Sequence, residues 1–188
     1  KALLIANSTR GTDASGIAYI GEHEGKTMVM YRKDALSAKE FVQAITDEEW
    51  IKIAQSPTGM IHARSRTKGT EKKNENNHPV MGWGWVVVHN GMISNDDDLF
   101  EYYKDDKREA EVDSIAIPLV LSKGENLEDS IKQVSVLAGS ATFSAWNVQD
   151  RDRVILARLG FNDLYMFLDA RHKIMYWSSA AVFCQVMP

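Results

Sequence analysis

The sequence contains a single cysteine, Cys184, among its 188 residues. A disulfide bond within the chain and a zinc site built from several cysteines are therefore both excluded. The sequence also lacks an apolar run long enough to span a membrane and a recognisable signal peptide. Its formal net charge is −4, which argues against nucleic acid as the main partner. From these absences we expect a cytoplasmic protein that acts on neither membranes nor nucleic acids.

Features that usually separate domains are also scarce. There are only four prolines, and we find no internal repeat, low-complexity tract or Pro/Gly-rich linker. Apolar residues make up 44% and charged residues 26% of the chain, as in ordinary globular proteins. This length is enough to bury a sizeable core. We therefore expect residues 1–188 to form one domain.

The periodicity of the apolar residues predicts helices grouped between two sets of strands. One helical pattern ends near residue 8, and others begin near residues 38, 48, 96, 113 and 127. The helix near residue 38 begins at the capping box Ser37–Glu40. Strand patterns cover residues 14–20, 26–31, 59–66, 83–89, 141–148, 153–159, 164–169 and 173–178. This order is typical of an α+β protein. We expect strands 14–31, 59–66 and 83–89 to build one part and the antiparallel meander 141–178 the other, with a five-residue turn at 21–25.

The stretch Trp85–Gly91 is the first candidate for a functional site. A tryptophan and three valines predict a short strand that is buried on both faces. His89, Asn90 and Gly91 then favour a turn that would end this strand. Such a turn would bring backbone N–H groups and the Asn90 side chain to the edge of the core, as an oxyanion-binding site requires. An ordinary strand-to-loop corner is the alternative.

Two other segments carry charges that a folded core must accommodate. An inward-facing Arg64 on strand 59–66 would need an anion, and the turn 67–69 could add N–H donors to it. A solvated edge strand or an RNA-binding patch are the alternatives. Asp113 could equally cap a helix or bind a ligand. The three acids Asp96–Asp98 lack calcium-loop spacing and lie at a predicted helix start, so we expect no metal there.

Five motifs occur in a fixed order. They are Arg10–Gly16, His62–Gly69, Asn76–Pro79, His89–Asn95 and the isolated Asp113. In this order and spacing the sequence resembles the class II glutamine amidotransferases, whose glutaminase domain is an Ntn (N-terminal nucleophile) hydrolase. The resemblance covers nearly the whole chain. It implies a four-layer αββα sandwich of two antiparallel sheets, L-glutamine as substrate, and neither a cofactor nor a metal.

The resemblance also implies a role for eight residues. Asn90 and Gly91 would form the oxyanion hole, and Arg64 would bind the α-carboxylate of glutamine with Thr67 and Lys68 nearby. Asp113 would bind the α-ammonium group, and Arg10 and Gly11 would shape the wall near the nucleophile. These roles agree with elementary chemistry, because a zwitterionic amino acid needs one fixed cation and one fixed anion.

The sequence departs from the family pattern at the nucleophile. The family uses an N-terminal cysteine on a strand before the first helix, and Lys1 already lies in that helix. We therefore expect the first strand to be missing from these residues, and Cys184 follows the last strand and cannot replace it. Ile115 also stands where the family has an acidic residue.

Three functions remain open. The first is an active glutamine amidotransferase, for whose ammonia a synthase domain, a separate subunit or no acceptor at all remains open. The second is a catalytically inactive homologue that acts as a binding or structural module. The third is another Ntn hydrolase, with serine or threonine as its first residue.

Overall fold

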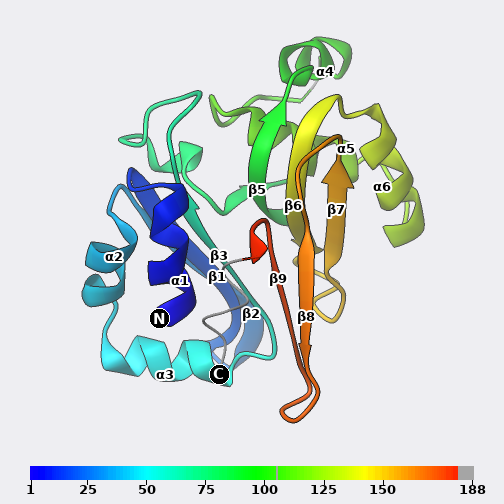
Figure 1. Cartoon of the computed structure of the whole chain (residues 1–188). Helices are drawn as coiled ribbons and strands as arrows, with labels where there is room; N and C mark the ends of the chain where they lie inside the picture. The colour runs from blue at the N-terminus through cyan, green and yellow to red at the C-terminus, as the bar shows by residue number, and fades with distance from the viewer. Residues whose placement is uncertain (105, 182–188) are drawn as a thin grey trace.

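The computed structural model describes residues 1–104 and 106–181, so Cys184 lies outside the described residues. Figure 1 shows the helices and strands that these residues form. The helices are α1 (Ala2–Asn7), α2 (Ala38–Ala44), α3 (Asp47–Gln55), α4 (Asp96–Tyr102), α5 (Ala116–Leu121) and α6 (Leu127–Gln133), with 3₁₀ turns η1 (Ser8–Arg10), η2 (Asn74–Asn76), η3 (Asp113–Ile115) and η4 (Val134–Val136). The strands are β1 (Ala14–His23), β2 (Lys26–Asp34), β3 (Gly59–Arg64), β4 (Val80–Gly82), β5 (Trp85–Ile93), β6 (Gly139–Asn147), β7 (Ile155–Leu159), β8 (Tyr165–Asp169) and β9 (Ile174–Ser178).

These strands form antiparallel sheets, as expected for an α+β protein. One sheet has the order β2-β1-β3, the second has the order β4-β5-β6-β7, and among the described residues β8 and β9 form a separate two-stranded sheet. No helix in the described part of the chain is long and apolar enough to cross a bilayer.

The expected grouping of the strands is wrong in two respects. The strand predicted at 83–89 pairs with β6 and not with β1 or β3. In addition, β8 and β9 do not continue the meander of β6 and β7. The turn predicted at His89–Gly91 is also wrong, because β5 runs through these residues as far as Ile93 in register with β6. Strand pairing depends on contacts between segments far apart in the sequence, which an apolar pattern does not specify.

Two shorter features follow from local sequence. The capping box is confirmed, because the Ser37 hydroxyl accepts the Glu40 N–H and the Glu40 carboxylate accepts the Ser37 N–H. The β1–β2 hairpin is also confirmed, but its turn has two residues and not five. Glu24 and Gly25 both have positive φ, 50° and 72°, which is the geometry of a tight two-residue hairpin turn.

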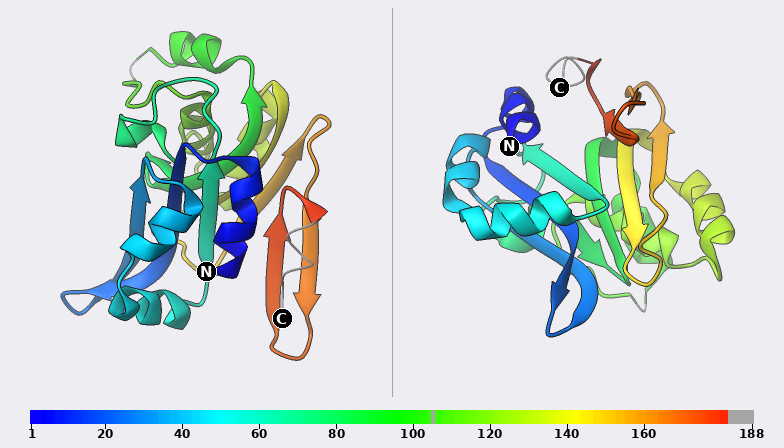
Figure 2. Two further views of the ribbon diagram at one scale, coloured as in Figure 1. Left: turned by 60° about the vertical axis from the view of Figure 1, so that its left-hand side comes forward. Right: turned by 90° about the horizontal axis from the view of Figure 1, so that it is seen from below.

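The core is divided into three apolar layers by the two larger sheets. Helices α1–α3 cover one face of sheet β2-β1-β3 and helices α5 and α6 cover the outer face of the second sheet (Figure 2). Between the sheets, Ala18, Met60, Val86 and Trp146 form one buried cluster. Side chains alternate along β1, so Ile17 and Tyr19 join the cluster under α1 and α2 instead. This stacking holds the end of β3 next to β5.

The layer between the sheets gives a test of the fold. Met60 is 2% exposed, and its replacement by alanine leaves a cavity, so Met60→Ala should lower the free energy of unfolding by about 2–5 kcal/mol. Met166 on β8 is 58% exposed, and Met166→Ala should change that free energy by less than about 0.5 kcal/mol. Urea denaturation of both variants measures the difference. An equal loss for the two would contradict a close-packed layer between the sheets.

Candidate functional site

A polar cavity of about 350 Å³ lies where β3 ends, β5 passes and η3 begins. It brings together Arg64, Thr67, Asn90, Gly91 and Asp113, which are far apart in the sequence. The other lining residues are His62, Ala63, Ser65, His78, His89, Val112, Ser114 and Asn162. One cation, one anion and a strand with a glycine therefore share one cavity.

The cation of this cavity is Arg64, the last residue of β3, which is only 4% exposed. Its guanidinium donates to Asn77 Oδ1 at 3.1 Å, to the Lys68 carbonyl at 2.7 Å and to the Gly69 carbonyl at 3.0 Å. These acceptors are neutral, and no carboxylate in residues 1–104 and 106–181 lies within ion-pair distance of it. The neutral acceptors orient the guanidinium but do not neutralise its positive charge.

The anion is Asp113, the first residue of η3, which is 7% exposed. Its Oδ2 accepts a hydrogen bond from the Ile93 N–H at 2.7 Å. Asp113 caps neither η3 nor α5, because their N-cap residues are Val112 and Ile115 and neither element has a side-chain cap bond. The alternative of a helix cap is thus wrong, and the side chain instead fixes the end of β5.

Asn90 and Gly91 lie inside β5, opposite Thr142 and Ala141 of β6. Gly91 has φ 123°, and a Cβ at this position would lie 2.2 Å from the Ser140 carbonyl oxygen. Only glycine fits here without moving the backbone. The Asn90 carbonyl accepts from Asn162 Nδ2 at 2.8 Å, a contact that sequence reasoning missed. Asn162 lies between the strand patterns 153–159 and 164–169, to which no site residue was assigned.

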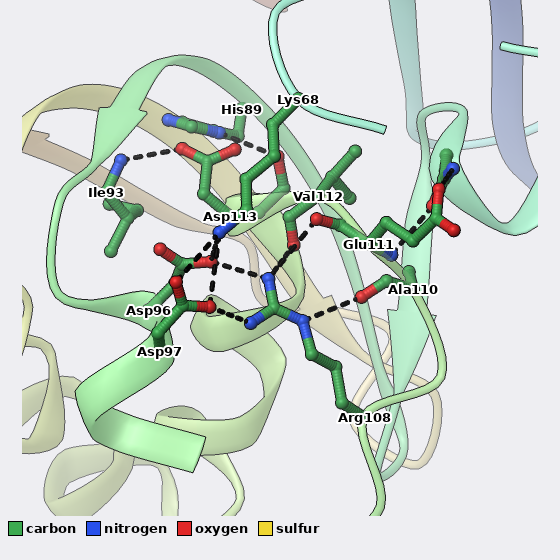
Figure 3. Close-up of polar contacts among 12 residues, drawn as sticks. Lys68, His89, Ile93, Asp96, Asp97, Arg108, Ala110, Glu111, Val112 and Asp113 are labelled. Atoms are coloured by element: carbon green, nitrogen blue, oxygen red, sulfur yellow. Dashed lines mark hydrogen bonds and ion pairs between the residues drawn. The ribbon is translucent and has the colours of Figure 1, made fainter. Parts of the chain in front are cut away.

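The remaining predicted residues are placed differently. Lys68 does not line the cavity, because its ammonium group binds Asp96 at 2.6 Å and Asp97 at 3.2 Å (Figure 3). Gly11 is buried behind the cavity, where a Cβ would lie 2.1 Å from the Arg64 carbonyl carbon. Arg10 ends η1, and its side chain lies outside what the structure describes.

Three histidines beside the cavity form a network that sequence reasoning did not assign. His62 Nε2 is 2.9 Å from the His89 carbonyl oxygen, so this nitrogen must carry a proton. The Ser114 hydroxyl joins His78 Nε2 at 3.0 Å and His89 Nδ1 at 2.8 Å. The rings of His62 and His78 stack with centroids 4.1 Å apart. The signal was available, since each histidine belongs to one of the motifs, but a motif alone does not reveal a shared partner.

Burial keeps these histidines neutral. It lowers the pKa of His62 to about 4, and it also lowers the pKa of His89 and of His78, the latter well below its ordinary value. The described residues contain no group of three or more His, Cys, Asp or Glu side chains arranged to hold a metal ion. The network is therefore a neutral scaffold that fixes β5 against β3 and η3.

The lowered pKa values predict a pH-dependent stability. Unfolded histidines bind protons near pH 6.5, whereas folded His62 does so only near pH 4. Between these values the unfolded state binds more protons, so the free energy of unfolding should fall as the pH is lowered from 6.5 towards 4. Urea denaturation across this range should show a smaller fall in His62→Gln and an unchanged fall in the exposed control His23→Gln. An undiminished fall in His62→Gln would contradict this account.

Comparisons with known proteins show the family to which this chain belongs. A family profile described as glutamine amidotransferase domain matches residues 62–185, more than half of the chain. The chain is 33% identical over 158 residues to the glutamine–fructose-6-phosphate aminotransferase (isomerizing) of Aquifex aeolicus, covering 80% of this chain and 25% of that protein. It is 30% identical over 187 residues to the 7-cyano-7-deazaguanine synthase of Saccharolobus solfataricus, covering 95% of this chain and 38% of that protein.

A solved structure supports the fold. The glutamine phosphoribosylpyrophosphate amidotransferase of B. subtilis superposes with a TM-score of 0.74 at 20% identity, covering 98% of this chain and 39% of that one. The chain thus spans well under half the length of each of these proteins. On the strength of the profile match and the relatives, the chain belongs to the class II glutamine amidotransferase family.

Proposed function

We propose that this domain binds L-glutamine and hydrolyses its side-chain amide to glutamate and ammonia. The observation that supports this most strongly is the placement of Arg64 and Asp113 at one cavity with Asn90 and Gly91. A free amino acid carries a carboxylate and an ammonium group on one carbon. A buried cation and a buried anion at a shared cavity match these two groups.

Each group then has a role in the reaction. Arg64 binds the α-carboxylate with Thr67 beside it, and Asp113 binds the α-ammonium group. The side-chain amide extends towards β5, where a thiolate attacks the amide carbon and the carbonyl oxygen becomes an oxyanion. The Asn90 side chain and the Gly91 N–H stabilise this oxyanion. The C–N bond then breaks, and the departing nitrogen takes up the proton that the N-terminal amino group removed from the thiol, so that it leaves as ammonia. Water then hydrolyses the thioester to glutamate and the free thiol.

We place the nucleophile, an N-terminal cysteine, on a strand that precedes α1. A second cavity of about 690 Å³ supports this, because it lies between β3 and the β8–β9 hairpin. Among residues 1–104 and 106–181, β3 is an edge strand of its sheet and β9 pairs only with β8. One extended strand in this cavity could pair with both edges. It would complete a four-layer αββα Ntn-hydrolase sandwich and end near His62 and Asn90, which line both cavities.

The ammonia needs an acceptor. We propose a synthase domain or subunit, since the relatives in which this domain occupies 25% and 38% of the length are named as an aminotransferase and a synthase. A cytoplasmic location, expected from the single cysteine and from the lack of a signal peptide and of a membrane-spanning run in this sequence, stays a prediction.

Binding of L-glutamate, the product, tests the assignment of the charged residues. Arg64→Ala and Asp113→Ala should each weaken binding at least about tenfold, the scale expected for removing one charge-assisted hydrogen bond. Arg66→Ala removes an arginine that is exposed and pairs with Glu71, and it should leave the affinity unchanged. Isothermal titration calorimetry measures all three. Unchanged affinity in Arg64→Ala or Asp113→Ala would remove that residue from the proposed site.

Turnover by the full-length protein tests the oxyanion role. Intact-mass analysis first identifies the mature N-terminal residue, and a cysteine is expected. Asn90→Ala should then lower kcat for glutamine hydrolysis by about a hundredfold with little change in binding, because the oxyanion charge develops only in the transition state. A serine or threonine at the N-terminus would indicate another Ntn hydrolase. Neither residue type, together with no turnover, would support an inactive binding module.

A further inference from the structure

An ion-pair network outside the cavity joins the two segments that carry its opposite charges (Figure 3). Its centre is Asp96, the first residue of α4, whose side chain is 7% exposed. Asp96 Oδ2 binds Lys68 Nζ at 2.6 Å and Arg108 Nη2 at 2.5 Å. The neighbouring Asp97 binds the same two cations, at 3.2 Å and 2.5 Å. One pair of carboxylates therefore holds a lysine and an arginine that come from different loops.

Lys68 connects this ion-pair network to Arg64. Lys68 lies in the loop that follows β3, and its ammonium group fixes this loop to the start of α4. The backbone carbonyls of Lys68 and Gly69 are the acceptors that hold Arg64 Nη2, at 2.7 Å and 3.0 Å. The position of Lys68 thus determines where the buried guanidinium can point.

Arg108 connects the same network to Asp113. Arg108 Nε donates to the Ala110 carbonyl at 2.9 Å, and Nη2 lies 3.3 Å from the carbonyl oxygens of Glu111 and Val112. These are the three residues immediately before Asp113. The guanidinium also lies 5.0 Å from the centroid of the Phe100 ring on α4. Arg108 thus fixes the segment that delivers Asp113 to the cavity.

A second tie connects the same two segments without α4. Asn76 Oδ1 accepts the Glu111 N–H at 2.8 Å, and Asn76 Nδ2 donates to Glu111 Oε2 at 2.9 Å. This tie holds the loop after β3 to the segment before Asp113, but at a point farther along the loop. Loss of Asp96 alone should therefore shift Arg64 and Asp113 relative to each other. It should not detach the loop after β3 from the segment before Asp113.

We propose that Asp96, together with Lys68 and Arg108, is a positioning device that sets the spacing between Arg64 and Asp113. The inference rests on the proposed function, in which these two residues bind the ends of one α-amino acid. An α-carboxylate and an α-ammonium group are attached to the same carbon, so a ligand bound at both ends is sensitive to this spacing. A ligand that has only one of the two groups can move together with the residue that binds it. Its affinity is therefore insensitive to this spacing.

The experiment compares three ligands in the full-length protein. L-glutamate carries both α groups, glutarate lacks the ammonium group, and 4-aminobutanoate lacks the α-carboxylate. Asp96→Asn should weaken L-glutamate about tenfold and each single-ended ligand less than about twofold, measured by calorimetry or, for weak binding, by NMR titration. The matched control is Asp98→Asn, which makes the same charge change on the same helical turn. Asp98 is exposed and forms no ion pair in the described part of the chain.

Each outcome decides the question. Equal weakening of all three ligands in Asp96→Asn would mean general damage to the site, and unchanged L-glutamate binding would mean that spacing is set elsewhere; either overturns the inference. If Asp96→Asn does not fold, Lys68→Met removes the ion pairs of a residue whose side chain is 42% exposed. This variant should weaken L-glutamate binding about threefold and leave binding of the two single-ended ligands unchanged. A wild-type protein that binds no L-glutamate at all would overturn the proposed function, and with it this inference.

Discussion

A positive charge held in the interior is the constraint around which this structure is organised. Removing a guanidinium from water costs several kcal/mol unless other groups replace the lost hydration. At Arg64 that replacement comes from Asn77 and from two backbone carbonyls of the following loop. Two contacts fix the backbone of Arg64: Gly11 approaches it closely, and β3 pairs with β1. The loop after β3 thus holds the Arg64 side chain, and β1 and Gly11 hold the backbone that carries it.

The opposite wall of the cavity is rigid for a different reason. β5 is paired with β6 along its whole length, and side chains from outside the sheet bind the backbone of three of its last five residues. His62 binds the His89 carbonyl, Asn162 binds the Asn90 carbonyl, and Asp113 binds the Ile93 N–H. A donor that must stabilise a developing charge needs this kind of preorganisation, because it cannot reorganise during the reaction. A strand provides it better than the turn that the sequence suggested.

Local features could be predicted from the sequence because their causes are local. The capping box at Ser37, the β1–β2 hairpin and the residues that meet at the cavity follow from short patterns or from motifs. What could not be predicted depends on distant partners. The Lys68 side chain points away from the cavity because Asp96 and Asp97, 28 and 29 residues later, attract its charge. Likewise β5 pairs with β6, and Ser114 joins two histidines, through contacts that no pattern within either segment encodes.

The central claim is that one cavity holds both charged ends of an amino acid between Arg64 and Asp113. A crystal structure of the full-length protein with L-glutamate bound tests it most directly. The account predicts an α-carboxylate oxygen within about 3 Å of the Arg64 guanidinium and the α-ammonium nitrogen within about 3 Å of Asp113, with the γ-carboxyl group beside Asn90 and Gly91. L-glutamate bound away from Arg64, or with its α-ammonium group bound by a residue other than Asp113, would contradict it.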